Sequence, residues 1–120
     1  MPDALSGVET EAAIARYFRG SRPLFEAFRT GCLSQFSVDM QAIDKSLQQA
    51  DAATVRRIAH NIKSAMNMLG HTALGAEALD IELAAQQGQL DRAANSWRTL
   101  AAAMQSLLSA AAGLDRGSTQ

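Results

Sequence analysis

Several residue types are scarce in this sequence, and each shortage excludes a class of protein. The chain of 120 residues has one cysteine, Cys32, so no disulfide can form within it, and a reducing compartment is the default expectation. Proline occurs twice and aromatic residues make up 5% of the chain. A net charge of −1 gives no support for binding to DNA or RNA. No apolar run reaches the roughly 18 residues that a membrane span needs.

Apolar residues, alanine above all, make up 48% of the chain. This composition favours helices packed on helices, and the length suits a single domain. The first residues include Asp3, Glu9 and Glu11 instead of a basic start followed by an apolar block. No secretory signal is therefore expected, and we predict a cytoplasmic protein.

Apolar residues recur at steps of three or four in five segments, which predicts five helices. The expected segments are 8–19, 21–50 with Ser21 as its cap, 51–69 capped by Asp51, 72–87 capped by Thr72, and 90–111. Glycines 20, 70 and 88 are expected to end the first, third and fourth helices. In the fourth helix, Leu79 and Leu83 are expected to widen the buried stripe, and Trp97 is expected to be buried in the last helix.

Short connections between long helices predict antiparallel neighbours. We therefore expect an all-α fold, an antiparallel up-down-up-down four-helix bundle with a short additional N-terminal helix. Residues 1–120 are expected to form a single domain, with 1–7 and 114–120 as flexible tails.

The stretch from Ala59 to Gly70 divides sharply into two sides when it is taken as a helix. At about 100° per residue, its apolar side chains form one stripe, made of Val55, Ile58, Ile62, Ala65, Met66 and Leu69. His60 lies about 200° from both Ile58 and Ile62 and so points to the polar side. No carboxylate lies within a turn of it on that face. The polar side chains around it are those of Arg56, Arg57, Lys63, Ser64 and Asn67.

This arrangement suits a histidine that accepts a phosphoryl group. Neutral imidazole attacks through one ring nitrogen, and the product brings a charge of about −2 near neutral pH. Lys63, three residues on, can meet the phosphoryl oxygens, and Ser64 is small enough to leave room for a partner's active site. Asn67 continues the face with a neutral hydrogen-bonding group. Arg56 and Arg57 are expected to attract an acidic partner.

These residues resemble the signature of the histidine-containing phosphotransfer (HPt) domain, Ala-His-x-x-Lys-Gly/Ser-small with Asn and Gly further on. The matching positions are Ala59, His60, Lys63, Ser64, Ala65, Asn67 and Gly70. The family most often has glycine where this chain has Ser64, which is still small. Leu74 and Glu82 on the next helix also match residues that are usual in the family. Glu82 matches a position that often helps the bundle pack, although Glu77 and Glu82 are expected to be solvated.

The resemblance implies a phosphohistidine carrier in a multistep two-component phosphorelay. His60 would take a phosphoryl group from a receiver-domain aspartate and pass it to another receiver domain, with Lys63 as its charge neighbour. Such a carrier has no turnover of its own and is not an enzyme. It needs no cofactor or metal, because Mg²⁺ is expected on the partner receiver domain. The expected partners are response-regulator receiver domains and a hybrid sensor histidine kinase. We expect a monomer with no nucleic-acid or membrane contact.

Two other functions stay open on the sequence. One is a helical interaction module that binds a receiver or kinase domain without being phosphorylated, and the other is a structural bundle that self-associates. An ATP-dependent histidine kinase does not fit, because Asn61 stands where an acidic residue usually follows the histidine and the chain has no Gly-rich nucleotide loop. His71 lies about 16 Å along a helix from His60, too far for the two to share a metal ion, and is expected to be a loop or cap residue. The sequence leaves open which imidazole nitrogen is used.

Overall fold

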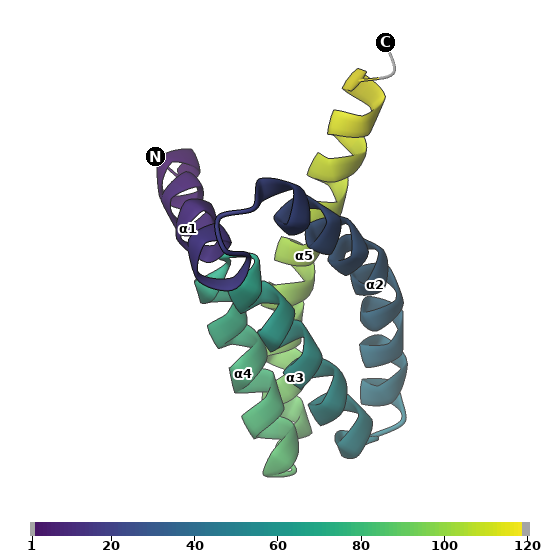
Figure 1. Cartoon of the computed structure of the whole chain (residues 1–120). Helices are drawn as coiled ribbons and strands as arrows, with labels where there is room; N and C mark the ends of the chain where they lie inside the picture. The colour runs from purple at the N-terminus through teal and green to yellow at the C-terminus, as the bar shows by residue number, and fades with distance from the viewer. Residues whose placement is uncertain (1, 119–120) are drawn as a thin grey trace.

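The computed structural model describes the backbone of residues 2–118 and the side chains of residues 7–113. Over these residues the chain is all-helical, as predicted, with five helices and no strand. They are α1 (Pro2–Tyr17), α2 (Arg22–Gln48), α3 (Ala52–Met68), α4 (Thr72–Gln86) and α5 (Leu90–Ser118) (Figure 1). In the part of the chain described, no helix is long and apolar enough to cross a membrane.

The two terminal helices are longer than the sequence pattern predicted. α1 begins at Pro2 and α5 reaches Ser118, so both continue past the last residues of the apolar pattern. The pattern depends on a buried face, whereas an existing helix propagates by adding one backbone hydrogen bond for each residue. The α5 end projects beyond the other helices (Figure 1). The expected flexibility of 1–7 and 114–120 stays a prediction.

Two of the predicted helix caps are confirmed. The Ser21 hydroxyl accepts a hydrogen bond from the backbone N–H of Leu24 at 3.3 Å, at the start of α2. At the start of α3, Asp51 accepts from the backbone N–H of Thr54 at 3.2 Å and from its hydroxyl at 2.6 Å. These bonds satisfy backbone donors that have no partner within the helix, and they fix where α2 and α3 begin.

The predicted cap at Thr72 is wrong by one residue. His71 is the N-cap of α4, and its side chain makes no capping bond. Thr72 is already helical, and its hydroxyl donates to Glu9 Oε1 at 3.2 Å. α1 therefore occupies the space beside the start of α4, and the threonine binds α1 instead of its own helix end.

The three reversals that join α2 to α5 share one geometry. Each has a residue with positive φ, namely Ala50 at 54°, Gly70 at 88° and Gly88 at 74°. The next N–H then bonds at 2.8 Å to the carbonyl five residues earlier, in the pairs Asp51–Ser46, His71–Met66 and Gln89–Ala84. This is the Schellman motif, in which glycine carries no steric cost. Gly70 is also needed for space, because a Cβ there would lie 2.7 Å from the carbonyl oxygen of Glu9.

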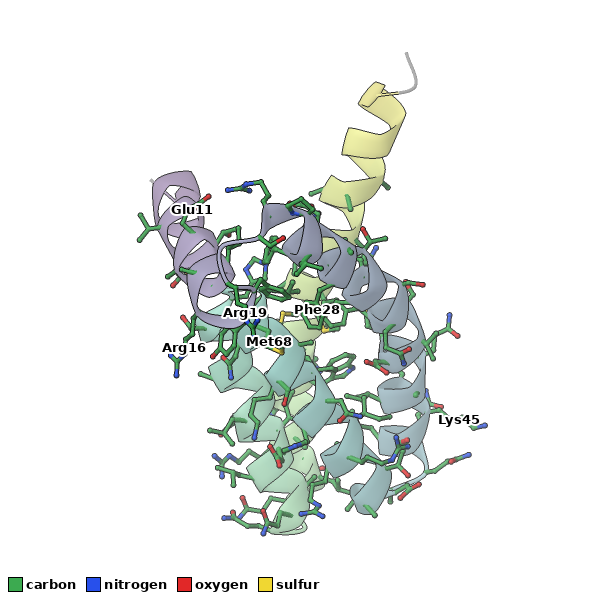
Figure 2. The ribbon with its side chains drawn as sticks, viewed as in Figure 1. Glu11, Arg16, Arg19, Phe28, Lys45 and Met68 are labelled. Atoms are coloured by element: carbon green, nitrogen blue, oxygen red, sulfur yellow. The ribbon has the colours of Figure 1, made fainter. Side chains whose placement is uncertain are left out.

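The core lies between α2, α3, α4 and α5. α3 packs against α4 and α2, α5 packs against the same two helices, and α1 contacts α3. The largest fully buried side chains are Val55, Phe36, Ile43, Ile62, Met66, Ile81, Leu100 and Met104. Trp97 is buried as predicted, and its indole N–H donates to Asp44 Oδ1 at 2.8 Å, linking α5 to α2. Phe28 and Met68 lie at the end of the bundle that is close to α1, whereas Lys45 points outward from α2 (Figure 2).

The outer side of α4 departs from the prediction. Its inner side packs closely, with Gly75 so near α3 that a Cβ there would collide with the Asn67 amide. Leu79 and Leu83 were expected to widen the buried stripe, but they are 39% and 40% exposed. Four helices have only a limited inner surface, and the small residues of α4 occupy its share. The two leucines are left on the solvent side.

Candidate functional site

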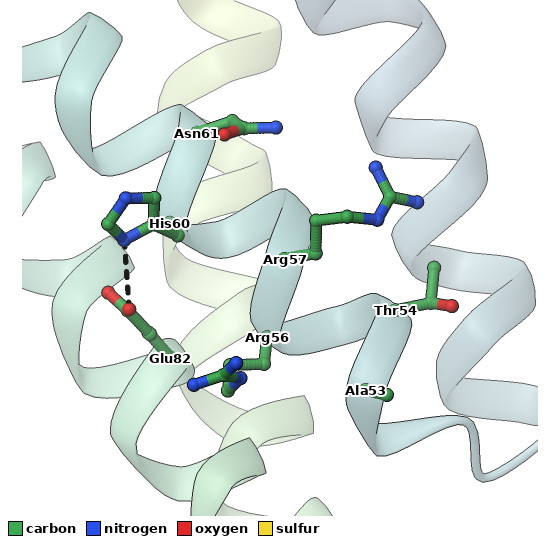
Figure 3. Close-up of a pocket in the computed structure, with 7 residues that line it drawn as sticks. All are labelled: Ala53, Thr54, Arg56, Arg57, His60, Asn61 and Glu82. Atoms are coloured by element: carbon green, nitrogen blue, oxygen red, sulfur yellow. Dashed lines mark hydrogen bonds and ion pairs between the residues drawn. The ribbon is translucent and has the colours of Figure 1, made fainter.

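His60 stands on the outer face of α3 and contacts a carboxylate from α4. Its side chain is 54% exposed, and its Nδ1 lies 2.9 Å from Oε2 of Glu82 (Figure 3). The reversal at Gly70 brings the two residues level, since His60 lies ten residues before it and Glu82 twelve residues after it. No carboxylate lies within a turn of His60 on its own face of α3, as the sequence indicated, and this neighbour comes instead from the next helix.

Glu82 joins the imidazole to the predicted lysine. Lys63 Nζ donates to Glu82 Oε1 at 2.9 Å, so each carboxylate oxygen has its own partner. The Glu82 side chain is only 14% exposed, and the prediction that it is solvated is wrong. Burial by itself raises the pKa of Glu82, but the hydrogen bonds and charges of Lys63 and His60 lower that pKa overall. The carboxylate is therefore ionised at neutral pH.

This contact determines which nitrogen of the neutral ring carries the proton. An ionised carboxylate can only accept hydrogen bonds, so Nδ1 of His60 must be the donor to Glu82. The other nitrogen, Nε2, then keeps a free lone pair in the ring plane. Figure 3 shows that nitrogen directed away from Glu82. In its neutral form, the ring thus presents an unprotonated nitrogen on the side away from Glu82, and this is the form of imidazole that acts as a nucleophile.

Three other predicted residues lie along the exposed face of α3. Ser64 is exposed, and its hydroxyl donates back to the carbonyl of His60 at 3.3 Å, so it leaves the ring uncovered. Arg56 and Arg57 line an open groove of about 510 Å³ together with His60, Glu82, Ala53, Thr54 and Asn61. Arg56 extends on the α4 side and Arg57 toward α2 (Figure 3). Among the described side chains, neither arginine lies within 4.0 Å of a carboxylate oxygen.

The charge of Arg57 nevertheless acts on the pKa of two acidic groups, Asp39 and Asp51. Asp39 of α2 is nearly buried and accepts a hydrogen bond from Gln35 at 3.0 Å. Burial raises the pKa of Asp39, and the Gln35 bond and the charge of Arg57 offset only part of that rise. Arg57 also contributes to the lowered pKa of Asp51, which hydrogen bonds from Thr54 dominate. Its charge is thus partly balanced by acidic groups within the chain.

Asn67 does not line the groove that Arg56, Arg57 and His60 share. It is half-buried against Gly75 and lines a separate hollow beneath α1, with Ala12, Ala13, Arg16, Tyr17 and Thr72. Its contacts are thus with α4 and α1. A role for Asn67 in partner binding stays a prediction.

His71 is a cap residue, one of the two roles expected of it. Its backbone carbonyl accepts the first hydrogen bond of α4, from Gly75 at 2.9 Å. Burial and the nearby charge of Arg29 lower the pKa of His71, and Glu9 opposes them. Over the residues whose side chains are described, no group of three or more His, Cys, Asp and Glu side chains is arranged to hold a metal ion.

Comparison with known protein families gives a match that covers both α3 and α4. The family model for the Hpt domain matches residues 28–112, well over half of the chain. The chain belongs to the Hpt domain family. Hpt domains act as phosphotransfer carriers in phosphorelays and interact with response-regulator receiver domains. Comparisons with curated proteins and with solved structures give no significant match.

In this Hpt domain, Glu82 contacts both His60 and Lys63 but was not among the site residues predicted from the sequence. It lies 22 positions from His60 and on a different helix, so the periodicity of α3 contains no trace of it. The sequence nevertheless contained a signal for this contact. Gly70 stands almost midway between His60 and Glu82, so a reversal at Gly70 places the two residues side by side. The family match includes His60, Lys63 and Glu82, whereas all of α1 lies outside it.

Proposed function

We propose that this Hpt domain carries a phosphoryl group on Nε2 of His60 within a multistep two-component phosphorelay. It receives the group from the aspartate of one receiver domain and passes it to another. The observation that carries the proposal is the 2.9 Å contact between Nδ1 and Glu82, which holds the proton of the neutral ring on Nδ1 and leaves Nε2 of this half-exposed side chain as the free nitrogen. The family match supports the same role.

The proposed step needs no proton transfer. The Nε2 lone pair of His60 attacks the phosphorus of the aspartyl phosphate, the Nε2–P bond forms as the P–O bond breaks, and the aspartate leaves as a carboxylate. Nδ1 keeps its proton, so the ring becomes positively charged. Glu82 already faces that N–H with a negative charge at 2.9 Å, and it stabilises the charge that develops during attack. The reverse reaction with a second receiver domain releases the group.

Lys63 is placed to balance the charge of the bound phosphoryl group. Its ammonium lies 2.9 Å from Glu82 and one turn along α3 from His60, so a small rotation brings it toward oxygens on Nε2. Ser64 keeps the approach to the ring open. Arg56 and Arg57 raise the rate of encounter with an acidic partner surface.

The remaining parts of the mechanism are assigned to the partners. We propose that Mg²⁺ and a lysine of the receiver domain supply most of the stabilisation of the transferring group, and that this chain alone has no turnover. It acts as a monomer in the cytoplasm, and a hybrid sensor histidine kinase is a candidate source of the phosphoryl group. Its complexes are transient, because donor and acceptor must reach the same nitrogen.

We propose the antiparallel up-down-up-down four-helix bundle for α2 to α5, with α1 as the additional N-terminal helix. The packing of α3 and of α5 against both α2 and α4 supports this arrangement. So do the three tight reversals of the same type. In such a bundle, the outer faces of α3 and α4 form one continuous surface around His60.

The test is transfer from a phosphorylated receiver domain in the presence of Mg²⁺, with the acid-labile phosphate mapped. The expected result is phosphate on His60 of the wild type and none on the His60→Gln variant. His71→Gln is the matched control and should be labelled like the wild type. Equal labelling of His60→Gln would overturn the proposal. Binding of the receiver without any label would favour the rival function, a helical interaction module that is not phosphorylated.

A further inference from the structure

The outer side of α4 exposes two leucines, although the helix already buries a complete inner row. Leu79 and Leu83 are 39% and 40% exposed, and the buried row consists of Gly75, Ala78, Ile81, Ala84 and Ala85. The solvent side of a helix that packs on a core is normally polar, so two leucines on that side depart from the usual pattern. Adjoining exposed apolar side chains on a helix of this kind indicate a surface that a partner covers.

Two sets of contacts, one between α4 and α3 and one between α4 and α5, determine which way these leucines face. Glu82 reaches α3 at His60, and Asp80 reaches α5, where it binds Arg92 and Ser96. At about 100° per residue, Leu79 lies about 60° and Leu83 about 100° around the helix from Glu82, and Asp80 lies about 160° around in the same direction. Both leucines therefore occupy the arc between the α3 edge and the α5 edge, on the solvent side. They adjoin the surface that presents the imidazole.

Any protein that exchanges a phosphoryl group with Nε2 must cover this surface. A specific interface of ordinary size occupies about 800 Å² on each partner, a disc with a radius of roughly 16 Å. Packed helices lie about 8–10 Å apart, so a disc centred on His60 includes the outer face of α4. The leucine pair thus falls inside the contact area of the partner.

We propose that the receiver domain that docks at His60 seats an apolar patch on Leu79 and Leu83 and places acidic side chains against Arg56. This inference rests on the proposed function, and it adds how the partner is held. Leu79 lies one turn from Glu82 toward the Gly70 end of the site, and Arg56 lies one turn from His60 toward the opposite end. Leu83 lies at about the level of Glu82, so the apolar contact extends along α4 beside the ring while the positive charge lies on α3. The two contacts together give the partner a single orientation over the ring.

The test compares a double variant, Leu79→Gln with Leu83→Gln, with the wild type. Receiver domains of the same organism are titrated against each protein, and transfer is measured over a range of receiver concentrations. The double variant should bind about tenfold more weakly and need about tenfold more receiver for half-maximal transfer. Its rate at saturation should be unchanged, because the nucleophile and its carboxylate are intact. The single variant Leu83→Gln should show a smaller shift in the same direction.

Leu24→Gln is the matched control. Leu24 is 60% exposed, and the α2–α3 reversal places it about 24 Å along α2 from the level of His60, outside the contact area. Its binding and transfer should equal those of the wild type. All three variants change exposed side chains, so their thermal midpoints should match. Should the double variant fail to fold, the Leu83→Gln variant alone decides.

Each outcome separates this inference from the proposed function. Normal affinity of the leucine variants for a receiver that labels the wild type overturns the docking surface and leaves the carrier function standing. Leucine-dependent binding with no label on His60 supports the surface and overturns the carrier. Absence of both binding and label overturns both. A concentration-dependent wild-type dimer in sedimentation, lost in the double variant, would assign the leucines to a second copy of this chain and overturn the receiver contact.

Discussion

Replacing Glu82 by glutamine should slow phosphoryl acceptance while leaving the nucleophile in place. The carboxylate accepts from both His60 and Lys63 at 2.9 Å. A hydrogen bond to a charged group contributes about 1.5–3 kcal/mol, against about 0.5–1.5 kcal/mol for a neutral one. Glutamine keeps an acceptor for Nδ1–H but loses the charge, a difference of about 1 kcal/mol at this half-exposed ring. Because positive charge develops on the ring only during attack, the loss appears as a rate about 5- to 10-fold lower.

Glu82→Ala removes the acceptor as well as the charge. We expect a loss of about 2 kcal/mol in transition-state stabilisation, roughly 30-fold in rate. Without the carboxylate, the proton of the neutral ring is no longer held on Nδ1, and the tautomer with its proton on Nε2 gains population. Nitrogen-15 NMR of the imidazole should show His60 mainly as the Nδ1–H tautomer in the wild type and a mixture in the alanine variant.

The assay is single-turnover labelling with saturating phosphorylated receiver and Mg²⁺, quenched in base and quantified as phosphohistidine. Glu77→Gln is the control, because it makes the same chemical change on the same helix at a residue outside the His60–Lys63–Glu82 contacts. Rates of both Glu82 variants within twofold of the wild type would refute the reasoning. An equal loss in the Glu77 variant would refute it as well, since the effect would then reflect the total charge of the domain.

The pH dependence of stability gives an independent measure of the same contact. The pKa of Glu82 is lowered in the folded chain, because the bonds and charges of Lys63 and His60 outweigh the effect of burial. A lowered pKa means that the ionised form stabilises the fold above the unfolded-state pKa, and that this contribution is lost as the pH falls through the lowered value. The difference in free energy of unfolding between wild type and Glu82→Gln should therefore be largest near neutral pH and shrink in acid.

Three further substitutions test the scaffold. Gly70→Ala should lower the free energy of unfolding by about 2–4 kcal/mol in urea titrations, because its φ is 88° and its Cβ would lie 2.7 Å from the Glu9 carbonyl oxygen. An unchanged urea midpoint would contradict that contact. Ala50→Gly should raise the thermal midpoint by about 2–5 °C, since alanine at φ 54° is strained by about 1 kcal/mol. A midpoint that falls would show that chain entropy outweighs the strain. Asp39→Asn should stabilise the fold at pH 7, because burial raises the pKa of Asp39 and the folded state disfavours its charge. That gain should disappear as the pH falls below the unfolded-state pKa, and a gain that persists in acid would have another cause.

Periodicity predicted the helices well because each depends on local chemistry. The apolar stripe of α3 is buried as expected, from Val55 to Leu69, with Ala65 partly buried at its edge. Ser21 and Asp51 cap the helices that they precede, and Gly70 takes the positive φ expected of a helix-ending glycine. Each of these features is set by a few neighbouring residues and follows from the sequence alone.

The errors concern how one helix is rotated against another. The exposure of Leu79 and the burial of Glu82 both depend on which side of α4 faces α3, and the sequence of α4 is apolar over too wide an arc to decide that. Thr72 looked like a cap because nothing local indicated that Glu9 of α1 would lie beside it. The paired carboxylate was missed for the same reason, since its partner lies across the reversal.

His60, the proposed acceptor, lies with Lys63 and Glu82 between Ala52 and Gln86, on two consecutive helices joined by one tight reversal. Bringing them together closes only a short loop, so this chemistry depends on few distant parts of the chain. A helical hairpin of this kind is a transferable unit. Substitutions in α1 or α5 that leave this hairpin intact should therefore leave the three side chains in contact.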